Sequence, residues 1–160
     1  MRIIYLSILV MLFISCDKEH FLYEKSQSVS NWQYGDIKKF EVPVSDTSYI
    51  YNLILDVKHD FDYPRQNTYV QIHTKFPKGD TIKGQLSLEL FDPNGLPYGS
   101  CDKGVCVTSI GLQDSVYFNQ IGDYYFGFEQ YSRDENLKGI QELTLKLQKT
   151  DILVTSGQKE

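Results

Sequence analysis

Cys16 is the residue of this chain whose surroundings most clearly predict a chemical modification. It follows Leu12-Phe13-Ile14-Ser15, which closes a largely apolar stretch that begins after the basic Arg2. A positive start, an apolar stretch and a small residue before a cleavage point are the features of a signal peptide. A cysteine directly after the cleavage point is typical of bacterial lipoproteins. We therefore predict a lipoprotein signal peptide over residues 1–15, with Cys16 as the lipidated first residue of the mature chain.

Two other interpretations of this segment fit less well. A transmembrane helix needs roughly 20 apolar residues, and the charged residues from Asp17 to Glu19 end the run early. An ordinary secretory signal favours small residues one and three positions before the cut. Phe13 is large, and it also departs from the Leu that a lipoprotein signal prefers there. Because no second hydrophobic run follows Cys16, we expect a water-soluble body held at a membrane by its N-terminal lipid.

Cys101 and Cys106 form an even pair once Cys16 is assigned to the lipid. In an exported, oxidising compartment such a pair favours a disulfide. The residues between them form turns readily, so the two cysteines could face each other across a hairpin. Free thiols and one half of a zinc site remain as alternatives. The zinc site would need further ligands, which the spacing of the three histidines does not supply.

No spacing of carboxylates or nucleophiles predicts catalysis. Acidic residues such as Glu89, Asp92, Asp123 and Glu129 show no paired arrangement of the kind that glycoside hydrolysis requires. The sequence contains no nucleophile elbow, zinc-protease motif or phosphate-binding loop. The run His59-Asp60-Phe61-Asp62 gathers metal-binding residue types, but no further ligand stands at a fixed offset. We expect no catalytic residue, no metal, no cofactor and no small-molecule ligand.

The composition favours strands as the elements that position these residues. The chain has 12 Tyr and 9 Phe in 160 residues, and aromatic side chains are enriched in half-buried strands. The aromatic residues also suit a sugar-binding surface, although a β-rich core uses them as well. The net charge is −5 with both signs interspersed, so no basic stripe for nucleic acid is present. We expect one domain and no nucleic-acid partner.

Period-two alternation predicts the strands themselves. Tyr51, Leu53, Leu55 and Val57 share one face of a strand, and Leu143, Leu145 and Leu147 share one face of another. Asp92-Pro93-Asn94-Gly95 is a strong turn sequence. The expected strands cover 51–58, 69–76, 86–90, 116–121, 123–131 and 140–148, with one or two more in 32–44.

These strands indicate an all-β fold. We predict a single antiparallel β-sandwich, jelly-roll-like, of about eight strands. It is expected to occupy residues 31–149, after a lipidated N-terminus and flexible tether over residues 16–30. A C-terminal tail is expected over residues 150–160.

The stretch from Tyr124 to Arg133 is unusual because aromatic residues occupy both faces of one expected strand. Either that strand is buried on both sides, or Tyr125 and Tyr131 form an exposed contact surface. Arg133 extends this candidate surface, and it could pair with Glu129. We treat Tyr125, Tyr131 and Arg133 as a weakly indicated interaction surface.

Several of these motifs, in this order and spacing, resemble the GldH family of gliding-motility lipoproteins from Bacteroidetes. The resemblance covers roughly residues 31–147. Ser132 stands where the family usually has Met, and Cys101 and Cys106 are not family features. The motifs that carry the resemblance are Cys16, Trp32, Tyr51-Asn52-Leu53, Asp60-Phe61-Asp62-Tyr63 before Asn67, Asp92-Pro93-Asn94-Gly95, Gly122-Asp123-Tyr124, Phe128-Glu129-Gln130-Tyr131-Ser132-Arg133 and Leu137-Lys138-Gly139-Ile140.

The resemblance implies a non-enzymatic lipoprotein of the cell envelope, anchored by its lipid at the outer membrane. It implies a role in gliding, a link to type 9 protein secretion and partners among other envelope proteins, with no catalytic residues to transfer. A carbohydrate-binding surface lipoprotein is the alternative, motivated by the sandwich pattern and the tyrosines. A hydrolase would need two carboxylates that converge in a pocket.

Overall fold

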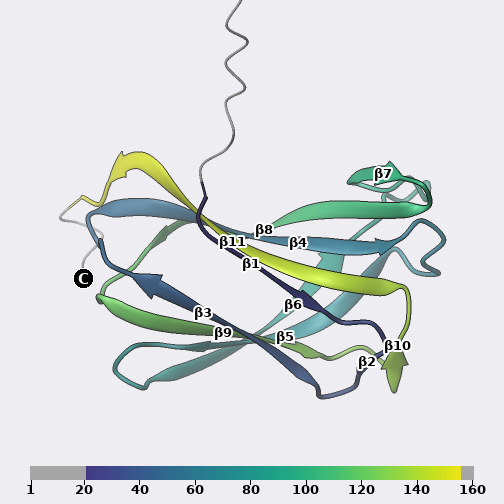
Figure 1. Cartoon of the computed structure of the whole chain (residues 1–160), viewed down its shortest axis with the longest axis horizontal. Helices are drawn as coiled ribbons and strands as arrows, with labels where there is room; N and C mark the ends of the chain where they lie inside the picture. The colour runs from purple at the N-terminus through teal and green to yellow at the C-terminus, as the bar shows by residue number, and fades with distance from the viewer. Residues whose placement is uncertain (1–20, 156–160) are drawn as a thin grey trace, which may run out of the picture.

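Eleven strands and no helix make up residues 21–155, the part of the chain that the computed structural model describes (Figure 1). All the strand pairs are antiparallel, which confirms the predicted all-β class. The strands are β1 (Phe21–Ser28), β2 (Trp32–Gln33), β3 (Ile37–Val44), β4 (Tyr49–Asp60), β5 (Asn67–Lys75), β6 (Thr81–Glu89), β7 (Ser100–Asp102), β8 (Val105–Tyr117), β9 (Gly122–Gln130), β10 (Asn136–Leu137) and β11 (Ile140–Leu153).

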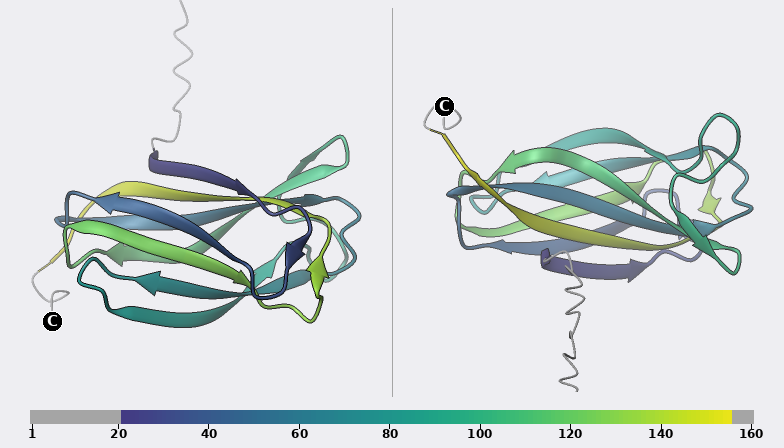
Figure 2. Two further views of the ribbon diagram at one scale, coloured as in Figure 1. Left: turned by 60° about the horizontal axis from the view of Figure 1, so that its bottom comes forward. Right: turned by 90° about the horizontal axis from the view of Figure 1, so that it is seen from above.

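The strands form two layers, as the predicted sandwich requires. A five-stranded sheet has the order β1-β11-β4-β8-β7, and a four-stranded sheet has the order β3-β9-β5-β6. In Figure 1 the five-stranded sheet is the upper layer, and Figure 2 brings the four-stranded sheet forward in its left view. The short pair β2 and β10 lies at one end of the sandwich, where the chain crosses between the layers.

The core lies between the two layers, where the period-two pattern places the apolar side chains. Leu143 and Leu145 of β11 and Leu55 of β4 are fully buried, as their alternation predicted. They face Phe40 of β3 and Phe128 of β9, whose rings meet edge to face at 5.7 Å. The Leu-rich strands belong to one layer and the Phe-rich strands to the other, because each sheet buries its apolar face against that of the other sheet.

β9 resolves the two interpretations of the aromatic strand. It lies between β3 and β5, and it turns Tyr124, Phe126 and Phe128 into the core. Tyr125 points the other way and is 37 % exposed. The strand is therefore central within its sheet but buried on one side only, because nothing covers the outer face of the four-stranded sheet within residues 21–155.

The expected tether was too long. Residues 21–28 form β1, an edge strand that pairs with β11 from Phe21 to Ser28. Most of the side chains in β1 are polar and only partly covered, so its pattern resembles that of a linker. Contacts across the ladder hold it: Ser26 bonds Thr144 at 2.7 Å, and Lys146 lies over the Phe21 ring at 4.8 Å. β1 therefore belongs to the folded domain, which was expected to begin at residue 31.

The strand count and two boundaries also differ from expectation. Eleven strands replace about eight because β1, β7 and β10 were missed, whereas β2 and β3 are the two strands allowed for in 32–44. β8 runs over Val105–Tyr117, where a strand was expected over 116–121, and β11 extends to Leu153 into the expected tail. In β8, Cys106 and Thr108 face the core and Val107 faces outward. Because the inward side chains are not the most apolar ones, the sequence of β8 lacks a clear alternation of apolar and polar residues.

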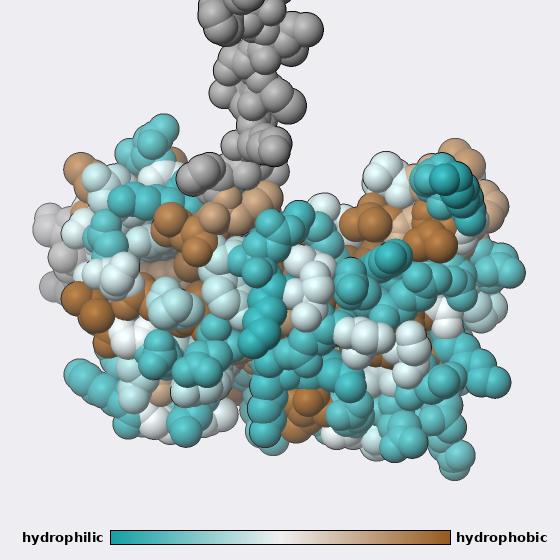
Figure 3. All heavy atoms as spheres, viewed as in Figure 1, coloured by the Kyte–Doolittle hydropathy of each residue, from teal (hydrophilic) through white to brown (hydrophobic). Residues whose placement is uncertain are grey.

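The surface of the described domain is mostly polar on the face seen in Figure 1. Figure 3 shows hydrophobic side chains there in small separate areas, one of them near β7, and not in a continuous band. Large apolar patches mark protein or membrane contacts, whereas scattered apolar side chains are ordinary. Residues 21–155 contain no helix of sufficient length and apolar character to span a membrane.

Candidate functional site

A hollow of about 900 Å³ lies at the end of the four-stranded sheet. We call it the tyrosine cleft, because Tyr34, Tyr69 and Tyr131 line it. Polar side chains complete the lining: Arg65, Asn67, Thr68, Gln85, Ser132 and Arg133. Three connections meet here, one before β3, one before β5 and one after β9.

The three tyrosines of the cleft keep their rings accessible. Tyr34 is 56 % exposed, Tyr69 44 % and Tyr131 39 %. The rings of Tyr34 and Tyr131 stack with centroids 6.1 Å apart and planes 25° apart. The Tyr131 amide donates to the carbonyl of Tyr69 at 3.1 Å, which fixes Tyr131 beside β5. Exposed aromatic faces that are held in place this way suit a ligand with an apolar face and a polar edge.

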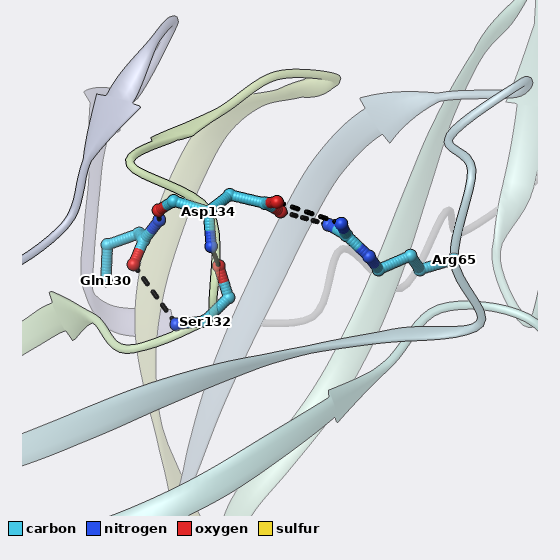
Figure 4. Close-up of polar contacts among 4 residues, drawn as sticks. All are labelled: Arg65, Gln130, Ser132 and Asp134. Carbon is cyan, nitrogen blue, oxygen red and sulfur yellow. Dashed lines mark hydrogen bonds and ion pairs between the residues drawn. The ribbon is translucent and has the colours of Figure 1, made fainter.

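Gln130 anchors the connection that carries Tyr131 and Arg133. Its side chain is fully buried, and both of its amide atoms are used within this connection (Figure 4). The Oε1 atom accepts from the Ser132 amide at 3.1 Å, and the Nε2 atom donates to the Asp134 carbonyl at 2.7 Å. A buried side-chain amide with both partners satisfied holds a turn firmly. The cleft wall from Tyr131 to Arg133 is therefore a fixed structure.

An ion pair joins that wall to the connection before β5. Both guanidinium ends of Arg65 donate to the Asp134 carboxylate, and the Nη2 to Oδ1 distance is 2.9 Å (Figure 4). The hydrogen bond to Asp134 raises the pKa of Arg65 above its ordinary value. Two parallel bonds fix the relative orientation of the two groups. The pair closes one side of the cleft and neutralises Asp134.

Tyr34 is held against the same wall by backbone hydrogen bonds. Its amide donates to the Glu135 carbonyl at 2.9 Å, and the Gly35 amide donates to the Gln130 carbonyl at 3.0 Å. Behind it, Trp32 is 1 % exposed, and its indole Nε1 donates to the Asp36 carbonyl at 2.9 Å. A buried Trp that is bonded at its polar end fixes the segment before β3. Side chains from three connections thus form one rigid end of the sandwich.

The weakly indicated surface of Tyr125, Tyr131 and Arg133 divides between two hollows. Tyr131 and Arg133 line the tyrosine cleft, whereas Tyr125 lines a second hollow of about 440 Å³ further along the outer sheet face. There the Tyr125 hydroxyl donates to Glu41 at 2.9 Å, which raises the pKa of Tyr125. Glu129, expected beside Arg133, instead contacts the Nε2 atom of His73 at 2.5 Å.

Sequence reasoning missed most of the cleft. Tyr34, Arg65, Tyr69 and Gln85 come from four separate segments, and only the folded sheet brings them together. Tyr69 could be placed on the outer face of its strand from period two, opposite the buried Val70. No comparable signal marks Tyr34 or Arg65, because both stand in connections whose paths depend on the packing of the sheets.

The disulfide candidates lie at the tip of a hairpin. Cys101 of β7 and Cys106 of β8 stand opposite each other in the ladder, and their sulfur atoms lie 1.99 Å apart. Lys103 and Gly104 between them both have positive φ, at 50° and 82°. That combination is the type I′ turn, which favours a tight two-residue hairpin. The two strands therefore place the cysteines where a disulfide can form.

We predict that this disulfide forms in the exported protein. Mass spectrometry after thiol labelling without reductant should find Cys101 and Cys106 unlabelled and joined in one peptide. Reduction should lower the free energy of unfolding by about 2 kcal/mol, because the closed loop is short. Measuring denaturant unfolding with and without reductant gives that difference. Two labelled thiols in protein taken from intact envelopes would show instead that the pair is free.

The His59 to Asp62 run, which gathers metal-binding residue types, does not assemble a site. His59 is fully buried; its Nε2 atom bonds the Thr108 hydroxyl at 3.0 Å, and its Nδ1 atom bonds the Asp60 carbonyl at 3.0 Å. Burial lowers the pKa of His59 below its ordinary value. Asp60 accepts a bond from Gln141. In the part of the chain described, no three His, Cys, Asp or Glu side chains gather around a common point.

Cys16 lies outside the described residues, as do the signal peptide over 1–15 and residues 16–20 of the expected tether. Lipidation at Cys16 therefore stays a prediction from the sequence. The described chain begins at Phe21, on the five-stranded layer, and the tyrosine cleft belongs to the other layer.

The sequence is similar to that of gliding motility lipoproteins. The family model described as GldH lipoprotein matches residues 21–147. The gliding motility lipoprotein GldH homolog of Christiangramia forsetii is 26% identical over 149 residues, which cover 89% of this chain and 91% of that protein. The gliding motility lipoprotein GldH of Flavobacterium johnsoniae is 26% identical over 147 residues, with coverage of 88% and 91%.

Two solved structures show a more distant similarity. A family GH115 4-O-methyl-α-glucuronidase with specificity for decorated arabinogalactans aligns with a TM-score of 0.42 and 10% identity over 84% of this chain, which corresponds to 18% of the glucuronidase chain. A protein from Sulfurospirillum deleyianum aligns with a TM-score of 0.40 and 12% identity over 81% of this chain and 98% of its own.

Proposed function

The chain belongs to the GldH lipoprotein family, and from this premise we propose that it is a non-catalytic binding component of the gliding machinery. Its relatives are named gliding motility lipoproteins, so it is a lipid-anchored protein of the cell envelope with a part in gliding motility. The binding end in this proposal is the tyrosine cleft. The observation that carries the proposal is the polar, aromatic and rigid lining of that cleft.

The chemistry of the cleft supports binding over catalysis. Its lining contains tyrosines, amides, hydroxyls and guanidinium groups, but no carboxylate, histidine or cysteine. General acid-base and covalent catalysis require a group that can give or take a proton near neutral pH, or a nucleophile beside a base. Arg65, the cleft residue with the strongest partner, is fixed by Asp134 and stays charged. These groups can orient a ligand without transforming it.

Cys16 carries the lipid in this proposal, which brings the domain close to the membrane. Five residue steps separate Cys16 from Phe21. An extended chain covers at most about 3.6 Å per residue, so Phe21 lies within about 18 Å of the lipidated residue. The proposed link consists of residues 16–20. It is shorter than the tether expected over 16–30, because β1 begins at Phe21. A short link restricts the orientations that the domain can adopt at the surface.

β1 separates the start of the described chain from the cleft. Phe21 begins β1, and the strand runs toward the end of the sandwich where β2 and β10 lie (Figure 1). Tyr34 of the cleft directly follows β2. An eight-residue strand is about 23 Å long, so the strand separates the anchored end from the cleft. The cleft also belongs to the four-stranded layer, whereas β1 belongs to the five-stranded one. This arrangement supports a role in which the cleft stays accessible while the lipid holds the chain at the start of β1.

The finer parts of the proposal concern membrane and partners. We infer attachment at the outer membrane and a link to type 9 protein secretion from the family. Anchoring raises the effective concentration of the domain for partners on the same surface. A carbohydrate-binding lipoprotein is the second candidate function, and the exposed tyrosines of the cleft favour it.

We predict that the protein is physically associated with gliding proteins in living cells. Cells that express the full chain with a C-terminal affinity tag are crosslinked intact, and the membranes are solubilised and purified. Mass spectrometry should recover motility or secretion components together with the tagged chain. An unrelated tagged outer-membrane lipoprotein at equal abundance serves as the control. Recovery of no component above that control would contradict the proposal.

A further inference from the structure

We propose that the tyrosine cleft binds an acidic polysaccharide, a glycan chain whose sugar units carry carboxylates. The proposal deepens the proposed function, on which it rests, by naming the ligand class of the same site. Three observations support it together. They are the accessible tyrosine rings, the polar lining without aliphatic side chains, and a guanidinium group that has no acidic partner.

The aromatic rings match the apolar face of a sugar. One face of a pyranose ring presents C–H groups, which pack on aromatic rings, while its rim presents hydroxyls. Tyr34 and Tyr131 are stacked and exposed. Tyr69, which belongs to β5, is bonded through its backbone carbonyl to the Tyr131 amide. Together they give adjacent aromatic surfaces that belong to one cleft. Such a surface can accept consecutive sugar units of a chain.

The remaining lining supplies hydrogen-bonding groups and no apolar anchor pocket. Gln85, Ser132 and Asn67 contribute amides and a hydroxyl, and no aliphatic side chain lines the cleft. Protein partners are usually held by apolar and aromatic anchors that insert into desolvated pockets. A chain of hydroxylated rings instead needs aromatic surfaces bordered by polar groups. The lining therefore favours a glycan over a protein segment.

Charge separates an acidic glycan from a neutral one. Two guanidinium groups line the cleft and no carboxylate does. Arg65 is paired with Asp134, but none of the seven ion pairs among residues 21–155 involves Arg133. A guanidinium group binds a carboxylate through two parallel hydrogen bonds. Arg133 is therefore positioned to recognise a uronic acid carboxylate, whereas Arg65 fixes the wall.

The cleft is already formed before any ligand arrives. Gln130 holds the connection from Tyr131 to Arg133 from within the core, and Asp134 ties it to Arg65. Backbone bonds from Tyr34 to Glu135 and from Gly35 to Gln130 hold the third connection. A rigid site loses little conformational entropy on binding. This geometry is suited to a flexible chain that contributes only a few contacts per sugar.

Binding is measured with the mature chain from residue 16, made soluble by Cys16→Ser, by isothermal titration calorimetry. The probes are polygalacturonate, alginate and hyaluronan, each compared with its carboxyl-reduced form, and poly-glutamate. We expect binding to at least one acidic polysaccharide and binding about tenfold weaker to its reduced form. Flat titrations with all three polysaccharides would overturn the proposal. Binding of poly-glutamate as tight as that of the acidic polysaccharide would also overturn the proposal, because the cleft would then recognise carboxylates without requiring a sugar.

Matched variants locate the binding. Arg133→Gln should weaken binding to the acidic polysaccharide about tenfold and leave binding to the reduced polymer unchanged. Tyr131→Ala should weaken binding to both forms. Tyr117→Ala, at 40 % exposure, and Lys103→Gln lie outside the cleft and should change neither. Thermal unfolding of each variant confirms the fold. Binding unaffected by both cleft variants would overturn the assignment.

The outcomes distinguish the glycan from the proposed function. Suppose that the titrations are flat and that cells with the cleft variants lose gliding. This result would reject an acidic glycan as the ligand but would still support the cleft as a binding site for gliding. Glycan binding in vitro together with normal gliding in those cells would support the glycan as the ligand. It would reject a role of the cleft in motility.

Discussion

Cells whose only copy of this protein carries Cys16→Ser, behind an ordinary cleavable signal peptide, are expected to stop gliding. The lipid predicted at Cys16 holds the domain at the membrane in this proposal, and residues 21–155 contain no helix long and apolar enough to span one. Each acyl methylene buried in a membrane contributes about 0.8 kcal/mol, so several chains make release negligible. Without them the domain diffuses away, and its effective concentration at the membrane falls by orders of magnitude. Colony spreading and single-cell gliding measure the loss.

The interpretation of that result depends on an intact domain. The soluble variant should show the far-ultraviolet circular dichroism of a β protein and unfold cooperatively, because β1 begins five residues after Cys16 and the core lies beyond it. Ser15→Ala keeps a small residue before the cysteine, and it should leave lipidation and gliding unchanged. Full motility with a soluble, unlipidated protein would show that the anchor is dispensable.

The parts of the fold that could be predicted are those with regular alternation. β4 places Leu and Val at every second position over 53–57, β11 places Leu at every second position over 143–147, and the structure buries those positions as expected. Successive side chains of a strand point to opposite faces, so a strand with one face in the core and one outside alternates apolar and polar residues. The turn at Asp92 was equally clear: Gly95 has a φ of 82°, and its amide donates to the Asp92 carbonyl at 3.0 Å.

The missed strands are those whose stability comes from their neighbours. β1 is polar along most of its length, and pairing with β11 makes it a strand. β10 is two residues long, and packing of Leu137 in the core fixes it against β2. No local pattern distinguishes such segments from loops, because tertiary pairing outweighs local preference. The expected tether was consequently ten residues too long, since it included residues 21–30.

The candidate site was only partly predictable for the same reason. Tyr131 and Arg133 stood out because they follow an aromatic strand. Their partners could not be named, because Tyr34 and Arg65 reach the cleft through connections positioned by packing. Gln130 was unremarkable in sequence, yet its buried amide shapes the wall. The residues that give a binding site its shape are frequently such buried polar supports.

The second large effect is expected from the cleft itself. Replacing Tyr131 with Ala and Arg133 with Ser removes an aromatic surface and the unpaired guanidinium group, which should abolish gliding in cells that have no other copy. Tyr131 is 39 % exposed and Arg133 is exposed, so the free energy of unfolding should change by only about 1 kcal/mol. Lipidation and abundance should be normal, because Cys16 and the core are untouched.

A matched variant controls for the loss of one tyrosine and one cation at the surface. Tyr117→Ala with Lys103→Ser removes one tyrosine and one cation outside the cleft, and Tyr117 is 40 % exposed. Cells with this control variant should glide normally. Immunoblots of membrane fractions should show equal amounts of both variant proteins.

The gliding speed of single cells that carry the cleft variant, measured against the matched control at equal protein level, tests the central claim most directly. The claim is that an anchored, non-catalytic domain acts in gliding by binding through the tyrosine cleft. It predicts cells with the cleft variant that do not glide and control cells that glide at the wild-type speed. Wild-type speed in cells with a folded, lipidated cleft variant would contradict it.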